Sequence, residues 1–340
     1  MPSQPRFIAL ADVVIGAHGA FADWMFALIE DLAAVAGRSV QRIDRFHQFD
    51  FSEEPRPIFL TNYPSPQLIL AIERGDVRVL FLSEPPVETL RYMQCRLNLS
   101  VMDAIRSQTA SAVANLAIGR STHSRVVERD TDRTVLQLVH VVASHLEMKI
   151  PDDDCDRIVA RAAGPAGPSA TPNEVLASGA DVSAIDREGA DRRMDRACRE
   201  ILEPLLVMAR FGGVRPIVWP TDVFTFHDRP GAPPPDDPAI AGPSRNLYYG
   251  PYLYLPPSSY RVEALMVFSE DIGAVLFVLE VHAGNWLARA RIEERQPGRF
   301  RGYFELEHFE ATSTVEIRLR NETPVTSGRL SLVELLFYAQ

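Results

Sequence analysis

Lysine is almost missing from this chain: Lys149 is the only one, so 34 of the 35 cationic residues are arginine. A Walker-A phosphate-binding loop ends in Lys followed by Ser or Thr, whereas Lys149 precedes Ile150 and Pro151. The sequence therefore excludes a Walker-A loop. The same bias, together with abundant Ala and Pro, is typical of a GC-rich bacterial genome, so we expect a bacterial protein.

Cysteine, basic runs and long apolar runs are also scarce. Cys95, Cys155 and Cys198 are odd in number and far apart, which argues against a disulfide framework or a zinc site and favours reduced, cytoplasmic thiols. The formal net charge of −10 argues against a nucleic-acid partner. No apolar run approaches the ~20 residues that span a bilayer, and the N-terminal sequence lacks a secretory pattern. We expect a cytoplasmic protein without a membrane span; the oligomeric state stays open.

Several catalytic signatures are absent as well. There is no Gly-x-Ser-x-Gly elbow of a hydrolase and no Gly-x-Gly-x-x-Gly dinucleotide fingerprint. His140 and His145 are five residues apart and off a common helix face, so they do not match metal-ligand spacing. Asp152–Asp154 allows a divalent-ion site, but an acidic helix start explains it more simply. No metal site and no catalytic residue is predicted.

The first half of the chain alternates short apolar runs with helical patterns, which is typical of an α/β fold. We expect one α/β three-layer domain over residues 1–215. Strands are expected at 7–15, 57–61 and 77–83, and helices at 23–35, 66–74, 134–149 and 190–211. Residues 163–190 contain GPAGPSATP and few large apolar side chains, which predicts a flexible loop.

Proline gathers in the middle of the chain: 12 of the 26 prolines lie between Pro204 and Pro257. Stretches such as RPGAPPPDDP suit neither a helix nor a central strand, so residues 216–244 are predicted to be a linker. Residues 245–340 then show apolar side chains at every second position, in six or more short segments separated by turn residues. This spacing predicts an all-β antiparallel sandwich.

Four stretches of the first domain resemble the sulfotransferase family, whose fold is a P-loop-type α/β sheet. Their order and spacing along the chain match the family's. They are VVIGAHGAFADWMFALIEDLA from Val13, FLTNYPSPQLILAI from Phe59, VRVLFLSEPPVETLRYM from Val77 and VVASHLEMKIPDDDCDRIVARAA from Val141. The resemblance implies a donor, adenosine 3′-phosphate 5′-phosphosulfate, bound at a loop that here comprises Gly16, Ala17, His18, Gly19 and Ala20.

The family's anion contacts are missing at the matching positions. Ser83 stands where the family has the arginine that holds the 3′-phosphate, Leu60 where it has a lysine, and Asn62 where the cytosolic branch has its histidine base. Sulfuryl transfer needs cations near the developing charge. The loop is therefore a degenerate P-loop, and the donor is expected only if arginines from elsewhere in the chain, such as Arg120, Arg125, Arg192 and Arg193, supply that charge.

His18 and Asp23 leave two interpretations of this loop. His18 can be protonated beside a bound phosphate, or the loop can be an ordinary strand-to-helix turn with His18 in a solvated or capping position. Asp23 in the first helical turn suits the helix dipole but would repel a phosphosulfate. We favour the ordinary turn.

The second domain begins with RNLYYGPYLYLPPSSYRVEALMVF from Arg245, which resembles the entry strand of carbohydrate-binding jelly rolls of the galactose-binding-like type. Saccharide recognition uses flat aromatic faces and polar groups. Tyr249, Tyr252, Trp286 and Arg289 are the candidate ligand-binding residues, with Tyr248 and Tyr254 as further aromatics. Alternating aromatics also serve as core, so packing or protein docking stays an alternative role.

These observations leave two functional hypotheses. The first is a non-catalytic, donor-site-degenerate scaffold with a glycan- or protein-binding sandwich, which the resemblance would place in bacterial surface-polysaccharide assembly. The second is an active sulfotransferase-like enzyme that modifies a saccharide. We favour the first, because arginine replaced lysine throughout the chain but not at the expected phosphate contacts.

Overall fold

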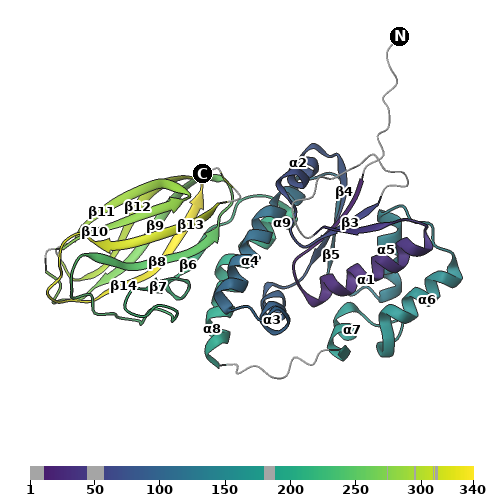
Figure 1. Ribbon diagram of the computed structural model, residues 1–340, viewed down its shortest axis with the longest axis horizontal. Coiled ribbons are helices and arrows are strands. Elements are labelled where there is room, and N and C mark those ends of the chain that lie inside the picture. The colour runs from purple at the N-terminus through teal and green to yellow at the C-terminus, as the bar shows by residue number, and fades with distance from the viewer. Residues whose placement is uncertain are drawn as a thin grey trace, which may run out of the picture. The chain divides into compact units, whose positions relative to one another are not determined.

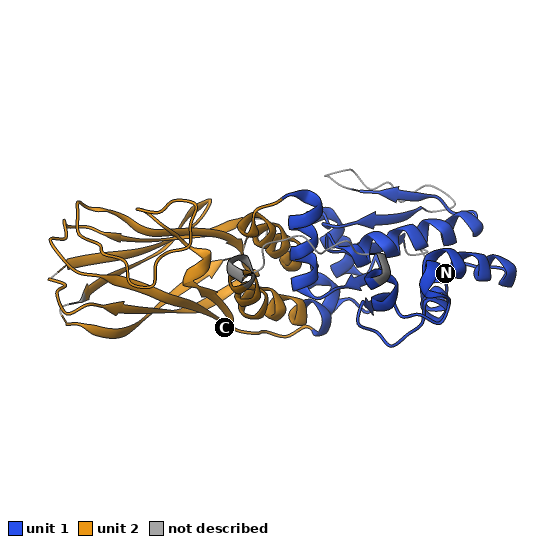
Figure 2. Cartoon of the chain, turned by 90° about the horizontal axis from the view of Figure 1, so that it is seen from below, with its two compact units in different colours: residues 1–98, 114–185, 209–211 blue, residues 99–113, 186–208, 212–340 orange. Residues whose placement is uncertain are grey.

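A computed structural model describes residues 11–43, 57–179, 188–273, 275–294, 296–308, 310 and 313–340. Residues 7–10 of the first expected strand, and 180–187 of the expected loop, lie outside these ranges. The chain forms two compact units (Figure 2): residues 1–98, 114–185 and 209–211 make unit 1, and residues 99–113, 186–208 and 212–340 make unit 2.

Unit 1 contains a parallel sheet with the strand order β2-β3-β1-β4-β5. The strands are β1 (Ala11–Gly16), β2 (Val40–Arg42), β3 (Ile58–Thr61), β4 (Val77–Ser83) and β5 (Ser124–Glu128). The central strand β1 pairs with both β3 and β4. All three strands run in the same direction, so the loops that follow Gly16, Thr61 and Ser83 meet at one edge of the sheet. Ligands of open α/β sheets bind at this carboxyl edge.

Helices cover both faces of this sheet (Figure 1). The helices are α1 (Ala20–Val35), α2 (Pro66–Arg74), α3 (Pro86–Leu97), η1 (Asn115–Arg120), α5 (Val135–His145), α6 (Asp152–Ala163), η2 (Gly164–Ala166) and α7 (Pro172–Gly179). One apolar core joins α1, α5 and α6 to sheet residues such as Val14 and Leu80. Val13 and Val79 point to the opposite side and are also fully buried, because successive strand residues face opposite ways. The predicted three-layer α/β arrangement is confirmed.

Unit 2 contains two antiparallel sheets, which confirms the predicted sandwich class. One sheet has the order β11-β10-β13-β8-β7 and the other β12-β9-β14-β6. The strands are β6 (Ile217–Pro220), β7 (Thr225–Phe226), β8 (Arg245–Tyr254), β9 (Ser258–Phe268), β10 (Val275–Ala283), β11 (Asn285–Glu294), β12 (Gly298–His308), β13 (Thr314–Asn321) and β14 (Leu330–Ala339). Large side chains fill the core, among them Trp219, Tyr248, Tyr260 and Phe277. We call the five-stranded sheet the β8 sheet and the four-stranded one the β9 sheet.

The helices of unit 2 are α4 (Val101–Ala114), α8 (Glu188–Ala197) and α9 (Glu203–Phe211), the last two joined by a π-helical turn at Cys198–Leu202. The last residue of α4, Ala114, and the last three of α9, 209–211, belong to unit 1. The grouping of these helices with the sandwich differs from the expected boundary at residue 215. The expected loop at 163–190 also contains a helix, α7. Helical turns form there despite the local Gly and Pro content.

The expected linker at 216–244 contains two strands of the sandwich. β6 pairs with β14 through Trp219 and Leu335, and β7 pairs with β8 through Phe226 and Tyr248. Both strands lie at sheet edges, where a missing proline N–H costs no ladder hydrogen bond. The expected linker therefore contains two edge strands, and its Pro-rich stretch at 229–238 lies between β7 and β8.

His145 in unit 1 is half-buried and His308 in unit 2 is buried, which predicts a free energy of unfolding that decreases below neutral pH. Burial lowers the pKa of His145 and of His308 from 6.5, and each ring bonds a backbone carbonyl, that of Val79 and that of Leu255. As the pH falls below about 6.5, these two histidines are protonated in the unfolded chain before they are protonated in the folded chain. The free energy of unfolding therefore decreases. Urea titrations from pH 7 to pH 5 should show a shallower decrease for His145→Gln/His308→Gln than for the wild type; equal slopes would contradict this prediction.

Candidate functional site

The five residues expected to bind a donor lie where β1 passes into α1: Gly16 ends β1, residues 17–19 form the loop and Ala20 begins α1. A Cβ on Gly16 would lie 2.9 Å from Ala22 Cβ and 3.1 Å from Leu82 Cβ. Asn62 Nδ2 donates a hydrogen bond of 3.0 Å to the Gly16 carbonyl. Gly19 is the N-cap of α1 but provides no side-chain acceptor for the first amides of that helix. The positive end of the helix is therefore available to an anionic group from elsewhere in the chain.

That group is the carboxylate of Glu84, which follows β4. Glu84 is only 6% exposed, and a Cβ on Gly19 would lie 1.9 Å from Glu84 Oε2. Gly19 has an extended backbone with φ −166°, so glycine is required here by close approach rather than by conformation. Glu84 thus lies against the loop, at the end of α1 where helix geometry favours an anion.

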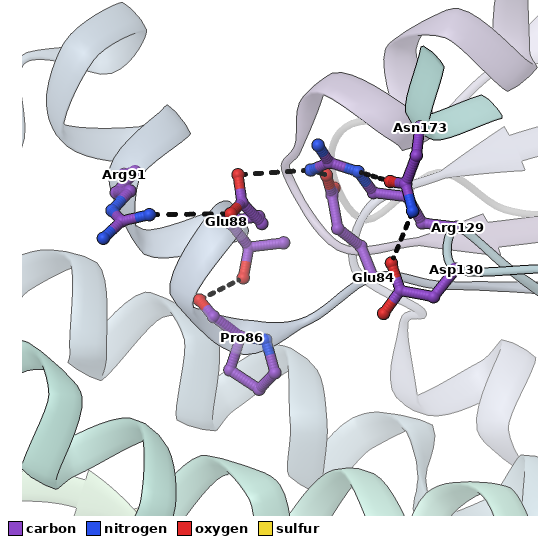
Figure 3. A network of polar contacts seen from close by, with 8 residues as sticks. Glu84, Pro86, Glu88, Arg91, Arg129, Asp130 and Asn173 are labelled. Atoms are coloured by element: carbon purple, nitrogen blue, oxygen red, sulfur yellow. Dashed lines mark hydrogen bonds and ion pairs between the residues drawn. The ribbon is translucent and has the colours of Figure 1, made fainter. Parts of the chain in front are cut away.

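Arg129 holds Glu84 in place (Figure 3). Arg129 Nη1 is 2.7 Å from Glu84 Oε1 and 3.3 Å from Glu88 Oε2, and Arg129 Nε donates to Asn173 Oδ1 at 2.9 Å. Asn173 Nδ2 in turn donates to Asp130 Oδ1 at 3.1 Å. The guanidinium lies between two carboxylates, so its charge is already matched within the chain.

The surroundings of Glu84 are acidic. Burial raises the pKa of the Glu84 carboxyl, and Arg129 and the Phe21 N–H oppose that shift without cancelling it. Asp23 accepts a hydrogen bond from the Tyr92 hydroxyl, and burial together with Asp23 raises the pKa of Tyr92 to about 12. A dianionic phosphosulfate would meet these carboxylates before any unpaired cation. The loop residues therefore do not fit the implied donor.

The other positions expected to contact the donor supply no cation. Ser83 and Leu60 are buried within the sheet, and Asn62 bonds the loop backbone. Of the arginines considered as replacements, Arg125 lies near the start of β5, Arg120 precedes that strand, and Arg192 and Arg193 belong to unit 2.

Sequence reasoning missed both Glu84 as an occupant of the loop and Arg129 as its partner. Arg129 follows SRVVE at 124–128, a short β-rich run that could have indicated a further strand and a charged side chain at its carboxyl end. Glu84 directly follows a predicted strand, but no sequence signal pairs it with Arg129.

The four candidate ligand residues of the sandwich are brought together on one face of the β8 sheet. Strand register aligns Tyr249 with Arg318, Arg318 with Glu280, and Glu280 with Arg289. Directly paired residues point to the same side. The side chains of Tyr249, Arg318, Glu280 and Arg289 therefore form one row across β8, β13, β10 and β11. At ~4.8 Å between neighbouring strands, this row is about 14 Å long.

A second row lies beside the first. Glu316 is aligned with His282, and His282 with Trp286. A β-bulge between Val281 and His282 shifts the register, and such bulges re-aim side chains. Trp286 is 59% exposed, so its indole is available on this face. We call the two rows the β8-sheet face.

Tyr252 lies at the border of this face and is held by two contacts. Its hydroxyl donates to Glu316 Oε1 at 2.9 Å, and Arg106 Cζ lies 5.5 Å from its ring centroid. Arg106 Nε also donates to the Pro251 carbonyl at 2.9 Å. Burial and Glu316 raise the pKa of Tyr252 to about 12, so the hydroxyl stays a donor. Tyr248, by contrast, is buried in the core and donates to the Leu330 carbonyl.

Charges on the β8-sheet face are paired with one another. Arg318 bonds Glu316 through Nε at 2.8 Å and Nη2 at 2.7 Å. Arg289 contacts Glu322, and its Nε is 3.8 Å from Glu280 Oε1. Burial alone would raise the pKa of Glu316, but Arg318 and Tyr252 hold it below its usual range. The face therefore offers fixed hydrogen-bonding groups with a balanced charge.

The described residues show no group of three or more potential metal ligands among His, Cys, Asp and Glu. Asp152–Asp154 forms the acidic first turn of α6, whose N-cap is Pro151, as the simpler interpretation predicts. No helix in the described part of the chain combines the length and apolar character that crossing a membrane requires.

No family model matches this chain, and no curated protein matches it. Solved structures similar to it include mouse sulfotransferase SULT7A1 complexed with PAP, at 11% identity over 55% of this chain and 82% of that one, with a TM-score of 0.38. Also similar are Family 16 Carbohydrate Binding Module-2 (11% identity, 29% of this chain, 74% of that one, TM-score 0.22) and TmCBM61 in complex with beta-1,4-galactotriose (17%, 30%, 70%, 0.22). Both kinds of fold were expected from the sequence. Identities this low concern fold alone.

Proposed function

We propose that this chain is a non-catalytic, sulfotransferase-like scaffold whose sandwich binds an uncharged saccharide on the β8-sheet face. The observation that carries the proposal is the alignment of Tyr249, Arg289 and Trp286 in two adjacent rows of one sheet. An exposed indole stacks on the apolar face of a sugar ring, and fixed carboxylate and guanidinium groups bond its hydroxyls. The role we propose for it is in bacterial surface-polysaccharide assembly.

The balanced charge of the face supports an uncharged ligand. Arg318 and Arg289 are each matched by a glutamate, so a sulfated or uronate polymer would gain little net attraction and would lose hydrogen bonds by breaking these pairs. Hydroxyl groups can accept from an arginine and donate to a glutamate without breaking the pair.

Glycan binding tests the proposal. The full chain should bind uncharged oligosaccharides on a glycan array, with weaker signals for their sulfated counterparts. Trp286→Ala should weaken binding of the best uncharged oligosaccharide, measured by titration calorimetry, by about tenfold or more, since a central aromatic contact is worth about 1.4 kcal/mol or more.

Tyr303 is the matched control, because it lies on β12 of the β9 sheet and is 51% exposed. Tyr303→Ala removes an exposed aromatic of similar size and should leave saccharide affinity unchanged. A blank array with folded protein, or equal losses for both variants, contradicts the proposal and favours packing or protein docking.

The non-catalytic part of the proposal predicts that the protein does not bind the donor nucleotide. Adenosine 3′,5′-bisphosphate at millimolar concentration should leave the melting temperature unchanged, because Glu84 lies where its phosphate would bind. A ligand that binds the native state at ten times its dissociation constant or more raises the melting temperature by several degrees. Such a rise would restore the sulfotransferase hypothesis.

A further inference from the structure

We infer that the β1–α1 loop is a masked oxyanion site in which Glu84 takes the place of a phosphate or sulfate group. The inference rests on the non-catalytic part of the proposed function and says what closes the loop. Removing the Glu84 carboxylate should open the site to a tetrahedral oxyanion. Two observations carry it: where the carboxylate lies, and what remains around it when it is removed.

The carboxylate is aimed into the loop. Glu84 is more than nine-tenths buried, and the Phe21 N–H at the start of α1 faces its carboxyl. Its Oε2 has no other hydrogen-bond partner among the described residues. This oxygen lies 1.9 Å from the position of a Cβ on Gly19. A surface ion pair would keep both carboxylate oxygens toward the cation or toward water, whereas here one oxygen contacts Arg129 and the other faces the loop.

Two groups that favour an anion remain without Glu84, the N-terminus of α1 and Arg129, although Glu88 still contacts Arg129 and Asp23 stays in the first turn of α1. α1 is a helix of 16 residues whose N-cap has no side-chain acceptor, so its first amides and its dipole favour an anion. Arg129 stays beside it, held by Asn173 through Nε. A guanidinium and a helix N-terminus together are a common arrangement for phosphate and sulfate recognition.

The decisive experiment is anion rescue of Glu84→Ala. In this variant the missing group has the size of acetate, and sodium sulfate or phosphate at about 20 mM should raise the melting temperature by about 2–4 °C over sodium chloride of equal ionic strength. The wild type should show no difference between the salts. A rise in melting temperature with inorganic sulfate shows that the opened site binds a free ion. A parallel measurement with adenosine 3′,5′-bisphosphate on the same variant tests whether it also binds the phosphate of a nucleotide.

Glu88→Ala is the matched control. Glu88 contacts the same nitrogen of Arg129 at 3.3 Å, but the nearest atoms to a Cβ on Gly19 belong to Glu84 and Thr89. Its removal frees the same charge without opening the loop, so sulfate and chloride should act alike. Glu84→Ala/Arg129→Met should also lose the rescue. Equal rescue of the Glu84 and Glu88 variants, or none in either, overturns the inference.

A second pair of variants keeps the test available if Glu84→Ala does not fold. Gly19→Ala should destabilise the wild type, because its methyl group collides with Glu84 Oε2. Glu84→Asp is one methylene shorter and retracts the carboxylate, so Gly19→Ala should cost at least several degrees less in that background. Additive effects of the two changes would show that Glu84 does not fill the loop. Saccharide binding by unit 2 is measured in a separate experiment. Failure of the saccharide proposal can therefore be told apart from failure of the inference about the β1–α1 loop.

Discussion

Arg129→Met is expected to destabilise the protein by about 3–5 kcal/mol at neutral pH, since removing one partner of a buried ion pair leaves an uncompensated charge. The Glu84 side chain is 3% exposed and Arg129 is its ion-pair partner at 2.7 Å. Without Arg129, the carboxylate must either stay charged in a buried position or take up a proton. Both outcomes cost free energy at pH 7.

The pH dependence identifies Glu84 as the source of that cost. Burial already raises the pKa of Glu84 above 4.5, and losing Arg129 raises it further. Because the pKa of Glu84 is higher in the folded than in the unfolded state, its buried charge reduces the free energy of unfolding by the full amount only at pH values above the folded-state pKa. Below about pH 4.5 the carboxyl is protonated in both states, and this cost disappears. Urea unfolding at pH 7.5 and pH 5 should therefore show a smaller difference between Arg129→Met and the wild type at pH 5.

Two further variants test this assignment. Glu84→Gln in the Arg129→Met background should recover roughly half of the lost free energy, because it removes the buried charge and keeps the shape. Arg91→Met is the control: Arg91 pairs with Glu88 at 3.6 Å and is 43% exposed, so its loss should cost at most about 1 kcal/mol. Equal costs for the two arginine variants would contradict a buried pair.

The fold classes could be predicted because the spacing of apolar residues within a single stretch of sequence already indicates a strand or a helix. VRVLFLS at 77–83 and the alternating residues of β13 each form the expected strand. The sequence did not reveal β6 and β7 within the expected linker, because both strands are short and lie at sheet edges. β7 pairs with β8, more than 20 residues away, and β6 pairs with β14, more than 100 residues away. Short edge strands depend on tertiary pairing, which local composition does not show.

The candidate sites differ in the same way. Tyr249, Tyr252, Trp286 and Arg289 were predicted from residue type, and the register that aligns them comes from pairings across four strands. The absence of a cation at Leu60, Asn62 and Ser83, which match the family's donor contacts, was also visible in the sequence. That Glu84 fills the resulting gap was not, because its partner Arg129 lies 45 residues away and no local spacing relates the two.

The opposite edge of the α/β sheet contains a second buried charge network. Asp12 in β1 accepts from Arg78 Nε at 2.6 Å and lies 2.7 Å from Arg38 Nη1. Arg78 also lies 2.6 Å from Glu147 Oε1, and Arg38 donates to the Leu146 carbonyl. One carboxylate therefore connects β1 to β4 and to the segments that follow α1 and α5.

Asp12→Ala is expected to cost about 3 kcal/mol or more, because it leaves two guanidiniums, each less than one-fifth exposed, without their shared carboxylate. Glu147→Gln is the matched control: Glu147 pairs with the same Arg78 but is 76% exposed, so its loss should cost at most about 1 kcal/mol. Urea unfolding at pH 7 measures both. Arg78→Met/Asp12→Ala should cost less than the sum of the single changes, since each single change leaves the other charge uncompensated. If the losses of unfolding free energy in the two single variants simply add in the double variant, Asp12 stabilises the sheet through packing alone. The ion pair between Asp12 of β1 and Arg78 of β4 would then contribute nothing to the stability of the sheet edge opposite the β1–α1 loop.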